Sequence, residues 1–187
     1  MKKLLALLII SCFLSAISVA QNSLPGLDKS PMDMSYYPVN YPSLKVQGKP
    51  IAPLIARVIY SRPQKNGRAI FDSLVEYGKV WRVGANEATE IEFFQPVMIS
   101  GKQIDKGRYT LYAIPNSTTW TIIINKETDT WGAYGYDEKK DLLRVDVPVQ
   151  KQTTSTEALV MVFEKSDTGA NLVIVWDKVK VALPIEF

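Results

Sequence analysis

The chain has 187 residues, of which 47% are hydrophobic and 22% are charged. This composition is typical of a globular protein, and the length favours one domain over two. Because the chain contains no histidine, imidazole general bases, Ser-His-Asp triads and His-ligated metals are excluded. Its formal charge of +3 includes no block of like charges, so we expect no nucleic-acid partner.

Residues 1–20 have the features of a signal peptide. Two lysines precede an apolar run from Leu4 to Ala16, and small residues follow at positions 18–20. This order of basic, apolar and small residues is what signal peptidase recognises. We predict cleavage after Ala20 and export to the periplasm or cell envelope, with no transmembrane segment left after cleavage.

The single cysteine, Cys12, lies inside this leader. The segment from Ile9 to Cys12 loosely resembles a lipobox, but the apolar run continues past it, so we do not expect lipidation. The predicted mature chain therefore has no thiolate nucleophile, no thiolate metal site and no disulfide. We predict no metal, no cofactor and no assigned catalytic residue. Any catalysis would depend on carboxylate, Lys, Tyr, Arg, Ser or Thr side chains.

Residues 21–53 hold six of the eleven prolines in the chain. Proline fixes φ and lacks a backbone N–H, so this segment is predicted to be extended and irregular instead of helical. Its methionine and tyrosine side chains are too apolar for a free linker. We expect the segment to pack on the domain that follows.

Residues 54–187 alternate between apolar and polar side chains, which is typical of half-buried strands. The turns between the runs are too short for crossover helices. The sequence predicts an all-β, antiparallel β-sandwich, jelly-roll or immunoglobulin-like, of about 8–10 short strands, with a closed barrel as the alternative topology. The predicted strands are Leu54–Tyr60, Thr89–Phe94, Val97–Ile99, Arg108–Ile114, Thr119–Asn125, Leu142–Val147, Leu159–Phe163, Leu172–Trp176 and Val179–Phe187. At most one or two short helices are expected, at Ala69–Tyr77 and near Asp137–Asp141.

Four of the six arginines fall between positions 57 and 82. A guanidinium is a planar fork suited to carboxylate or phosphate, so Arg62, Arg68 and Arg82 could form a pocket for an anionic group, with Lys65 and Lys79 nearby. In the alternative interpretation the arginines pair with acids of the same region and lock its loops. The acids available for this pairing are Asp72, Glu76, Glu87 and Glu90.

The bend from Trp81 to Glu87, with the sequence WRVGANE, places Asn86 and Glu87 beside an arginine. Glu87 could act as an acid or base with a partner carboxylate such as Asp137, as in glycosidases. An acid in such a bend more often caps backbone donors. The following acids, Glu90 and Glu92, alternate with apolar residues, as on a strand face exposed to water.

A second aromatic stretch, WGAYGYD, contains Trp131, Tyr134 and Tyr136. Flat aromatic faces in a polar loop could form a wall against which sugar rings stack. Alternatively, these rings plug one end of the sandwich, since aromatic side chains bury large areas. Trp120 and Trp176 lie inside strand patterns and are predicted to belong to the core.

Six ordered motifs resemble domain-of-unknown-function family 2911, and the closing segment Val175–Ile185 fits it too. The motifs are YSRPQKNGRAIF, YGKVWRVGANEATEIEF, KGRYTLYAIP, WTIIINK, WGAYGYD and LLRVDV. The resemblance covers nearly all of residues 54–187. It implies an exported single-domain protein of a family found mostly in Bacteroidetes-type bacteria. The family has no assigned activity, so the resemblance carries no functional residue over to this chain.

These observations favour a non-catalytic exported β-sandwich that binds a small molecule, a glycan or an envelope component. The ligand-binding candidates are Arg62, Arg68, Arg82, Asn86, Glu87, Trp131, Tyr134 and Tyr136. Two alternatives are a carboxylate-based glycan hydrolase and a structural envelope protein without a pocket. Nothing in the sequence indicates an oligomeric state.

Overall fold

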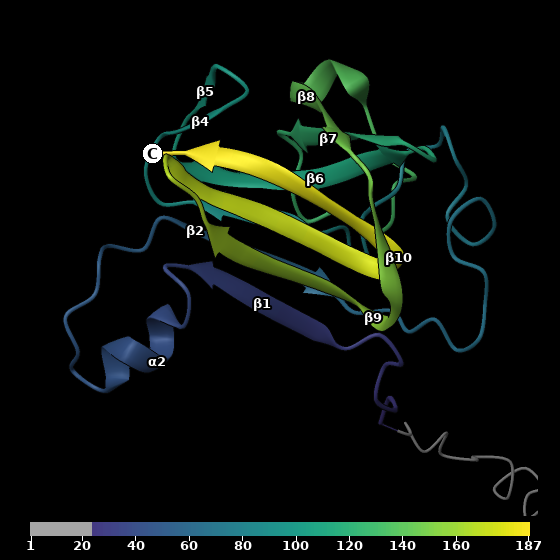
Figure 1. The fold of residues 1–187 in the computed structure, drawn as a ribbon, viewed down its shortest axis with the longest axis horizontal. Coiled ribbons are helices and arrows are strands. Elements are labelled where there is room, and N and C mark those ends of the chain that lie inside the picture. Colours follow the sequence, from purple (N-terminus) through teal and green to yellow (C-terminus); the bar gives the residue numbers. More distant parts are fainter. Residues whose placement is uncertain (1–23) are drawn as a thin grey trace, which may run out of the picture.

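Two antiparallel β-sheets packed face to face form the body of the protein in a computed structural model that describes residues 24–187 (Figure 1). The prediction of an all-β sandwich is confirmed. The predicted signal peptide and Cys12 lie outside the described residues. Within residues 24–187, no helix is both long enough and apolar enough to span a membrane.

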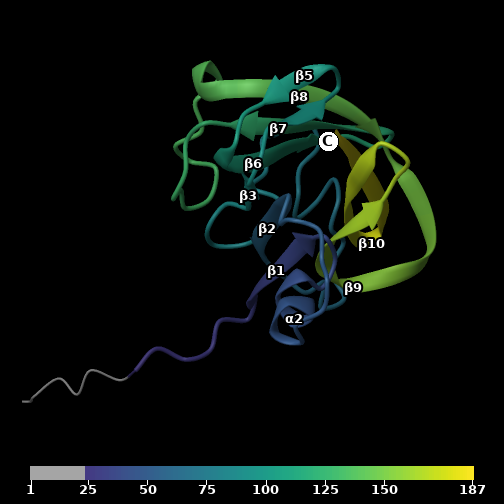
Figure 2. The same cartoon turned by 90° about the vertical axis from the view of Figure 1, so that its left-hand side faces the viewer.

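The larger sheet has six strands in the order β1-β2-β3-β6-β7-β8. These strands are β1 (Met32–Tyr37), β2 (Ala56–Ser61), β3 (Glu90–Phe93), β6 (Gly107–Pro115), β7 (Thr119–Asn125) and β8 (Asp141–Pro148). The smaller sheet has the order β5-β4-β10-β9. Its strands are β4 (Val97–Ile99), β5 (Lys102–Ile104), β9 (Gln150–Lys165) and β10 (Gly169–Glu186). The edge strands β1 and β9 lie next to each other, which brings the two sheets together along that side (Figure 2).

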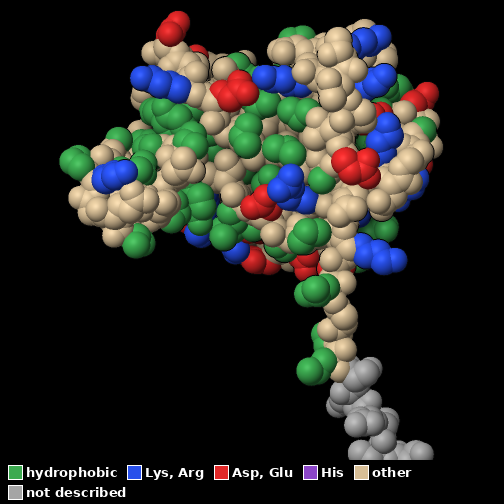
Figure 3. Space-filling view, turned by 60° about the horizontal axis from the view of Figure 1, so that its bottom comes forward, with side chains coloured by type: hydrophobic (Ala, Val, Ile, Leu, Met, Phe, Trp, Pro, Cys, Tyr) green, Lys and Arg blue, Asp and Glu red, His purple; other side chains and the backbone are tan. Residues whose placement is uncertain are grey.

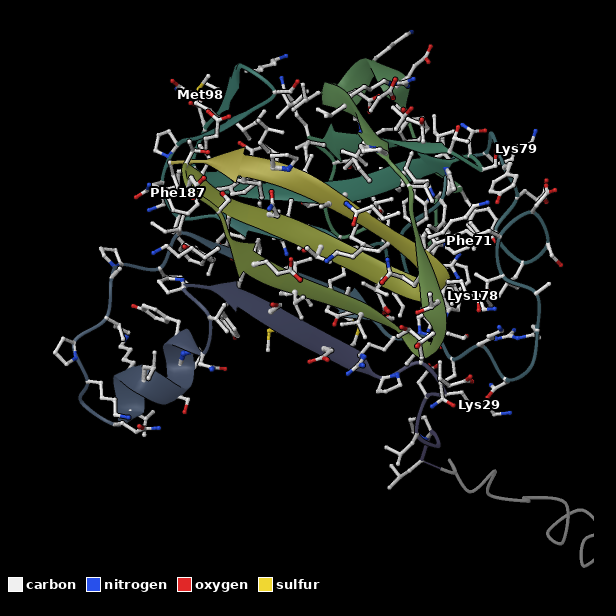
Figure 4. The ribbon with its side chains drawn as sticks, viewed as in Figure 1. Lys29, Phe71, Lys79, Met98, Lys178 and Phe187 are labelled. Carbon is white, nitrogen blue, oxygen red and sulfur yellow. The ribbon has the colours of Figure 1, made fainter. Side chains whose placement is uncertain are left out.

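Each alternating run predicted as a strand lies within or overlaps an observed strand. The last two predicted runs both belong to β10, which turns back on itself at Asp177, where φ is 51°. As a result, the backbone N–H of Phe187 donates to the carbonyl of Thr168 at 3.2 Å. Figure 4 shows Lys178 and Phe187 at opposite ends of the sandwich. The two predicted strands therefore correspond to the two halves of β10.

The proline-rich segment contains regular structure that the sequence did not indicate. Strand β1 pairs with β2 in continuous register, from Met32 opposite Ser61 to Tyr37 opposite Ala56. A short helix, α2 (Tyr41–Val46), has a proline in its first turn, where a backbone N–H is not needed. No residue of α2 is buried, and the helix projects from the sandwich beside β1, with apolar side chains gathered around it (Figure 3).

The predicted helix at Ala69–Tyr77 is wrong. The segment instead forms a compact turn in which the N–H of Val75 donates to the carbonyl of Ile70 at 2.8 Å. Asp72 adopts a left-handed conformation with φ of 63°, which a right-handed helix excludes. The turn buries Ile70 and Val75 and directs the Phe71 ring inward. The other predicted helical turn is confirmed as the 3-10 helix η1 (Glu138–Lys140).

The core at one end of the sandwich is an aromatic cluster formed by Phe71, Trp81, Trp120 and Trp176. The Phe71 ring lies 5.2 Å from Trp120 and 6.3 Å from both Trp81 and Trp176, measured between ring centroids. Trp120 and Trp176 are each 1% exposed, which confirms their prediction as core residues. Two members of this cluster, Phe71 and Trp81, come from the segment between β2 and β3, so the cluster attaches that segment to the sheets.

We expect Gly169→Ala to destabilise the fold, because the two halves of β10 lie very close to each other there. A methyl group at this position would lie 2.2 Å from the carbonyl oxygen of Ile185 and 3.0 Å from the Cα of Glu186. Such overpacking typically costs about 1–3 kcal/mol, measurable by urea unfolding. The control is Gly135→Ala, whose methyl group meets no atom within 4 Å. Equal stability of the two variants would contradict the close packing at Gly169.

Candidate functional site

The segment 62–89 between β2 and β3 contains no named helix or strand. Loops of this length are uncommon in compact domains and usually carry function. It covers the end of the sandwich that holds Phe71 and Lys178, opposite the end that holds Met98 and Phe187 (Figure 4). Most of the predicted binding residues lie on this segment, so its conformation determines the site.

The bend that follows Trp81 is held by backbone and side-chain hydrogen bonds. Trp81 and Ala113 exchange two backbone hydrogen bonds of 2.7 and 2.9 Å. The Thr89 hydroxyl donates to the carbonyl of Val83 at 2.8 Å. Val83 has a φ of 54°, which is a strained conformation for a β-branched residue, and its side chain is fully buried. Such strain persists only where the surroundings impose it, and it is common at binding sites.

A cavity of about 280 Å³ opens beside this bend; we call it the arginine cavity. Trp81 and Trp176 line it and stack on each other with ring centroids 6.0 Å apart and planes at 16°. Arg68, Arg82 and Leu74 also line the cavity. The remaining lining residues are Ser30, Pro63, Val75, Gly84 and Ala85. Apolar rings beside a few polar groups are the usual composition of a small-molecule site.

Arg82 is the unusual residue of the arginine cavity. Its Nε atom is buried and has no hydrogen-bond partner among the described residues. No ion pair between residues of the described chain involves its guanidinium. Burial lowers the pKa of Arg82 below its ordinary value, partly offset by the nearby Tyr134. A buried donor without an acceptor is destabilising, and each such case in a native structure needs an explanation.

Most other arginines of the described chain differ from Arg82, because their guanidinium groups pair with carboxylates. Each of the four outside the cavity pairs with a carboxylate. These pairs are Arg57–Glu92 at 2.7 Å, Arg62–Asp33 at 2.9 Å, Arg108–Asp129 at 2.6 Å and Arg144–Asp141 at 2.8 Å. Arg68 instead donates to the backbone carbonyls of Lys65 and Gln64. Among the described residues, Arg68 and Arg82 are therefore the arginines without a carboxylate partner, and both line the cavity.

The structure separates Arg62 from the predicted anion pocket. Besides the Asp33 carboxylate, Arg62 Nε donates to the carbonyl of Leu159 at 3.0 Å, which attaches the start of the segment to β1 and β9. Lys65 is also engaged elsewhere, since its Nζ lies 2.6 Å from the Asp177 carboxylate. Of the arginines predicted for the pocket, the cavity brings together Arg68 and Arg82.

The alternative interpretation, in which these arginines pair with acids of the same region, does not hold for Arg82 among the described residues. Glu87 is exposed, and no ion pair among the described residues joins it to Arg82. Glu90 and Glu92, predicted to face water, are half-buried in cross-strand ion pairs with Arg108 and Arg57. Neighbouring strands place these opposite charges side by side, and this register is not visible in one strand alone.

A second cavity, of about 390 Å³, lies beside Asn86, Glu87 and Trp131; we call it the tryptophan shelf. Its other lining residues are Asp28, Ser30, Met32 and Ser61. Ser30 lines both cavities. The bend also connects them, since Gly84 and Ala85 line the first cavity and the next two residues line the second. The two cavities are therefore adjacent parts of one surface. Asp28 and Ser30 lie in the proline-rich segment, where nothing in the sequence had pointed to a site.

Of the three predicted wall residues, two lie together. The Trp131 and Tyr134 rings stack with centroids 5.8 Å apart and planes at 13°, and they are 61% and 85% exposed. Tyr136 points elsewhere: its ring packs against Tyr112 at 5.2 Å, and its hydroxyl donates to Asp141 at 2.6 Å. The Tyr136 side chain belongs to a small apolar cluster around Tyr112 and not to the aromatic wall.

These elements define a class of protein: an antiparallel β-sandwich with an arginine-lined cavity and an aromatic shelf at one end. The family model described as "Protein of unknown function (DUF2911)" matches residues 43–185, so the chain belongs to that family. This confirms the family resemblance of the sequence motifs. No curated protein and no solved structure matches the chain significantly.

We expect Arg82→Met to stabilise the free protein. The substitution keeps the apolar stem and removes a half-buried charge whose Nε lacks an acceptor, which should add about 1 kcal/mol to the free energy of unfolding. Arg62→Met is the matched control, because it breaks the contacts with Asp33 and Leu159 and should destabilise. Urea unfolding distinguishes the two variants. If Arg82→Met lost as much stability as Arg62→Met, Arg82 would have a partner in the folded protein.

The ionisation of Tyr136 should make the free energy of unfolding depend on pH in the alkaline range. Burial, reinforced by the Asp141 carboxylate, raises the pKa of Tyr136 from 10.0 to about 12. Below pH 10 the phenol is protonated in both states; between about pH 10 and 12 only the unfolded chain ionises. The free energy of unfolding therefore falls across this window in the wild type. Tyr136→Phe should fall less steeply in urea titrations over the same range. Parallel curves would contradict the raised pKa.

Proposed function

We propose that this protein is a non-catalytic binding protein whose ligand places an anionic group against Arg82 and Arg68. The observation that carries the proposal is the buried, unpartnered Nε of Arg82 in a cavity. A carboxylate or phosphate supplies the missing acceptor, and charge-assisted hydrogen bonds of this kind are among the strongest in proteins. Binding would thus recover the free energy that the folded protein loses by burying this group.

The rest of the cavity supports a ligand with a flat or apolar part next to its anion. Trp81, Trp176 and Leu74 contribute apolar surface, and Leu74 is 48% exposed without a ligand. The volume of about 280 Å³ lies just below the roughly 300–1,000 Å³ range of ligand sites. This size suits one ring with its substituents. We also propose that the protein is exported, on the features of residues 1–20.

The glycan hydrolase hypothesis, with Glu87 and Asp137 as acid and base, has less support. The Asp137 carboxylate accepts the backbone N–H of Lys139 at 3.0 Å and caps η1. Its backbone carbonyl accepts from the Asn125 amide at 3.0 Å. Asp137 thus has a local structural role, whereas Glu87 lines the tryptophan shelf. If the protein had only a structural role and bound no ligand, the buried Arg82 Nε without an acceptor among the described residues would have no explanation. Binding is therefore the function that the geometry favours.

A thermal-shift and fluorescence titration with inorganic phosphate, benzoate and glucuronate tests the proposal. At least one of these probes should raise the melting temperature, since a ligand at 100 times its Kd adds about 2.7 kcal/mol. It should also change the fluorescence of Trp81 and Trp176. Arg82→Met should weaken this binding at least tenfold, or about 1.4 kcal/mol.

Lys79→Gln is the charge-matched control, because Lys79 is exposed and points away from the sandwich (Figure 4). The Kd of this variant for the same probe should stay within about twofold of the wild-type value. Because a tenfold change in Kd equals about 1.4 kcal/mol, this difference is below about 0.5 kcal/mol. Equal weakening in both variants would indicate general charge attraction and contradict the proposed site. The absence of binding by all three probes would also count against it.

A further inference from the structure

The Trp131–Tyr134 pair is exposed and yet held in place. Trp131 forms a β-bridge with Glu87, and the N–H of Gly132 donates to the carbonyl of Asn86 at 2.8 Å. Gly132 has a φ of 69°, and a methyl group there would lie 2.7 Å from the Tyr134 ring. Glycine therefore allows the tyrosine to pack close to the backbone beside the tryptophan. Rings ordered before binding lose little conformational entropy when a ligand arrives.

The residues around Trp131 suit hydroxyl groups. Asn86 offers a donor and an acceptor, Ser30 offers a hydroxyl, and the carboxylates of Asp28 and Glu87 accept hydrogen bonds. A saccharide ring has an apolar C–H face, which matches the face of an indole, and hydroxyls at its edge, which match these polar groups. The tryptophan shelf thus has the chemistry of a sugar subsite.

The charges differ between the two adjoining cavities. Arg68 and Arg82 line the arginine cavity, where they attract an anion. Asp28 and Glu87 line the tryptophan shelf, where they repel one. A ligand that spans both cavities across Ser30 is therefore anionic on one ring and neutral on the next. The volumes of about 280 and 390 Å³ each accept about one ring, by comparison with ligand sites of roughly 300–1,000 Å³.

We infer that the ligand is an acidic oligosaccharide, with its anionic ring in the arginine cavity and the adjoining neutral ring stacked on Trp131. This inference rests on the proposed function, because it assigns the anion of that site to a sugar. The alternation of charged and neutral rings distinguishes the ligand from a neutral glycan and from a polyuronate.

Calorimetric titration of the full mature chain with three tetrasaccharides tests this inference. Hyaluronan tetrasaccharide alternates glucuronate with a neutral sugar, chitotetraose is neutral, and tetragalacturonate carries a charge on every ring. Hyaluronan tetrasaccharide should bind at least tenfold more tightly than either of the others and than free glucuronate. Glucose 6-phosphate is titrated beside glucuronate, so that a preference for phosphate over carboxylate is detected at the arginine cavity.

Variants assign the binding to the two cavities. Trp131→Ala should weaken hyaluronan tetrasaccharide at least tenfold and leave glucuronate within twofold, whereas Trp131→Phe should recover most of the loss. Arg82→Met should weaken both ligands at least tenfold. Phe187→Ala removes an aromatic ring that is 43% exposed at the opposite end of the sandwich (Figure 4), and it should change neither affinity.

The outcomes distinguish the inference from the proposed function. If glucuronate or glucose 6-phosphate binds through Arg82 but Trp131→Ala has no effect on the tetrasaccharide, the acidic oligosaccharide is overturned and the anion site stands. Equal or tighter binding of chitotetraose or tetragalacturonate also overturns it. If neither the monosaccharides nor the tetrasaccharides bind, the inference fails, and the proposed function fails with it only if inorganic phosphate and benzoate do not bind either.

Discussion

The packing of Phe71 and Trp81 against Trp120 and Trp176 is the contact on which the candidate site depends. These rings join a long segment without regular structure to the start of β7 and to the turn in the middle of β10. Aromatic pairs add about 0.5–1.5 kcal/mol beyond their buried area, so the contacts of Phe71 and Trp81 with the two strand tryptophans stabilise the position of the segment. Trp81 is part of this cluster, and its neighbour Arg82 lines the same cavity as Trp81 and Trp176.

In this position Arg82 forms no ion pair with a carboxylate of residues 24–187. The guanidinium of Arg82 is half-buried, so it contacts less water than a fully exposed guanidinium does. Its Nε has no acceptor among the described residues. Natural proteins tolerate such groups at functional sites, where stability is lost in exchange for a preformed binding geometry. The strained Val83 next to it is in keeping with a binding site, because backbone strain of this kind is common at such sites.

Alternation of side chains was sufficient to predict the strands, because half-buried strands repeat every two residues wherever one face meets the core. It was not sufficient to predict β1 or α2, because the prolines of that segment suggested an irregular chain. It also failed at Ala69–Tyr77, where apolar residues with helical spacing form a turn. The sequence also indicated the stretches that contain Arg82 and Trp131. It could not show that Arg62 pairs with Asp33 or that Tyr136 turns inward, because these contacts join residues far apart in the chain or depend on register.

Among the described residues Arg82 has no ion-pair partner and its Nε has no acceptor, so we expect this group to bind the anion of a ligand. Nitrogen-15 NMR of the arginine side chains tests it most directly, because each Nε–H gives its own signal. On titration with glucuronate, the account predicts that the Arg82 Nε–H signal moves strongly, as expected for a new charge-assisted hydrogen bond. The signals of Arg57, Arg62, Arg108 and Arg144, which already have carboxylate partners, should stay in place. An Arg82 signal that does not move, or equal movement of all of these signals, would contradict the account.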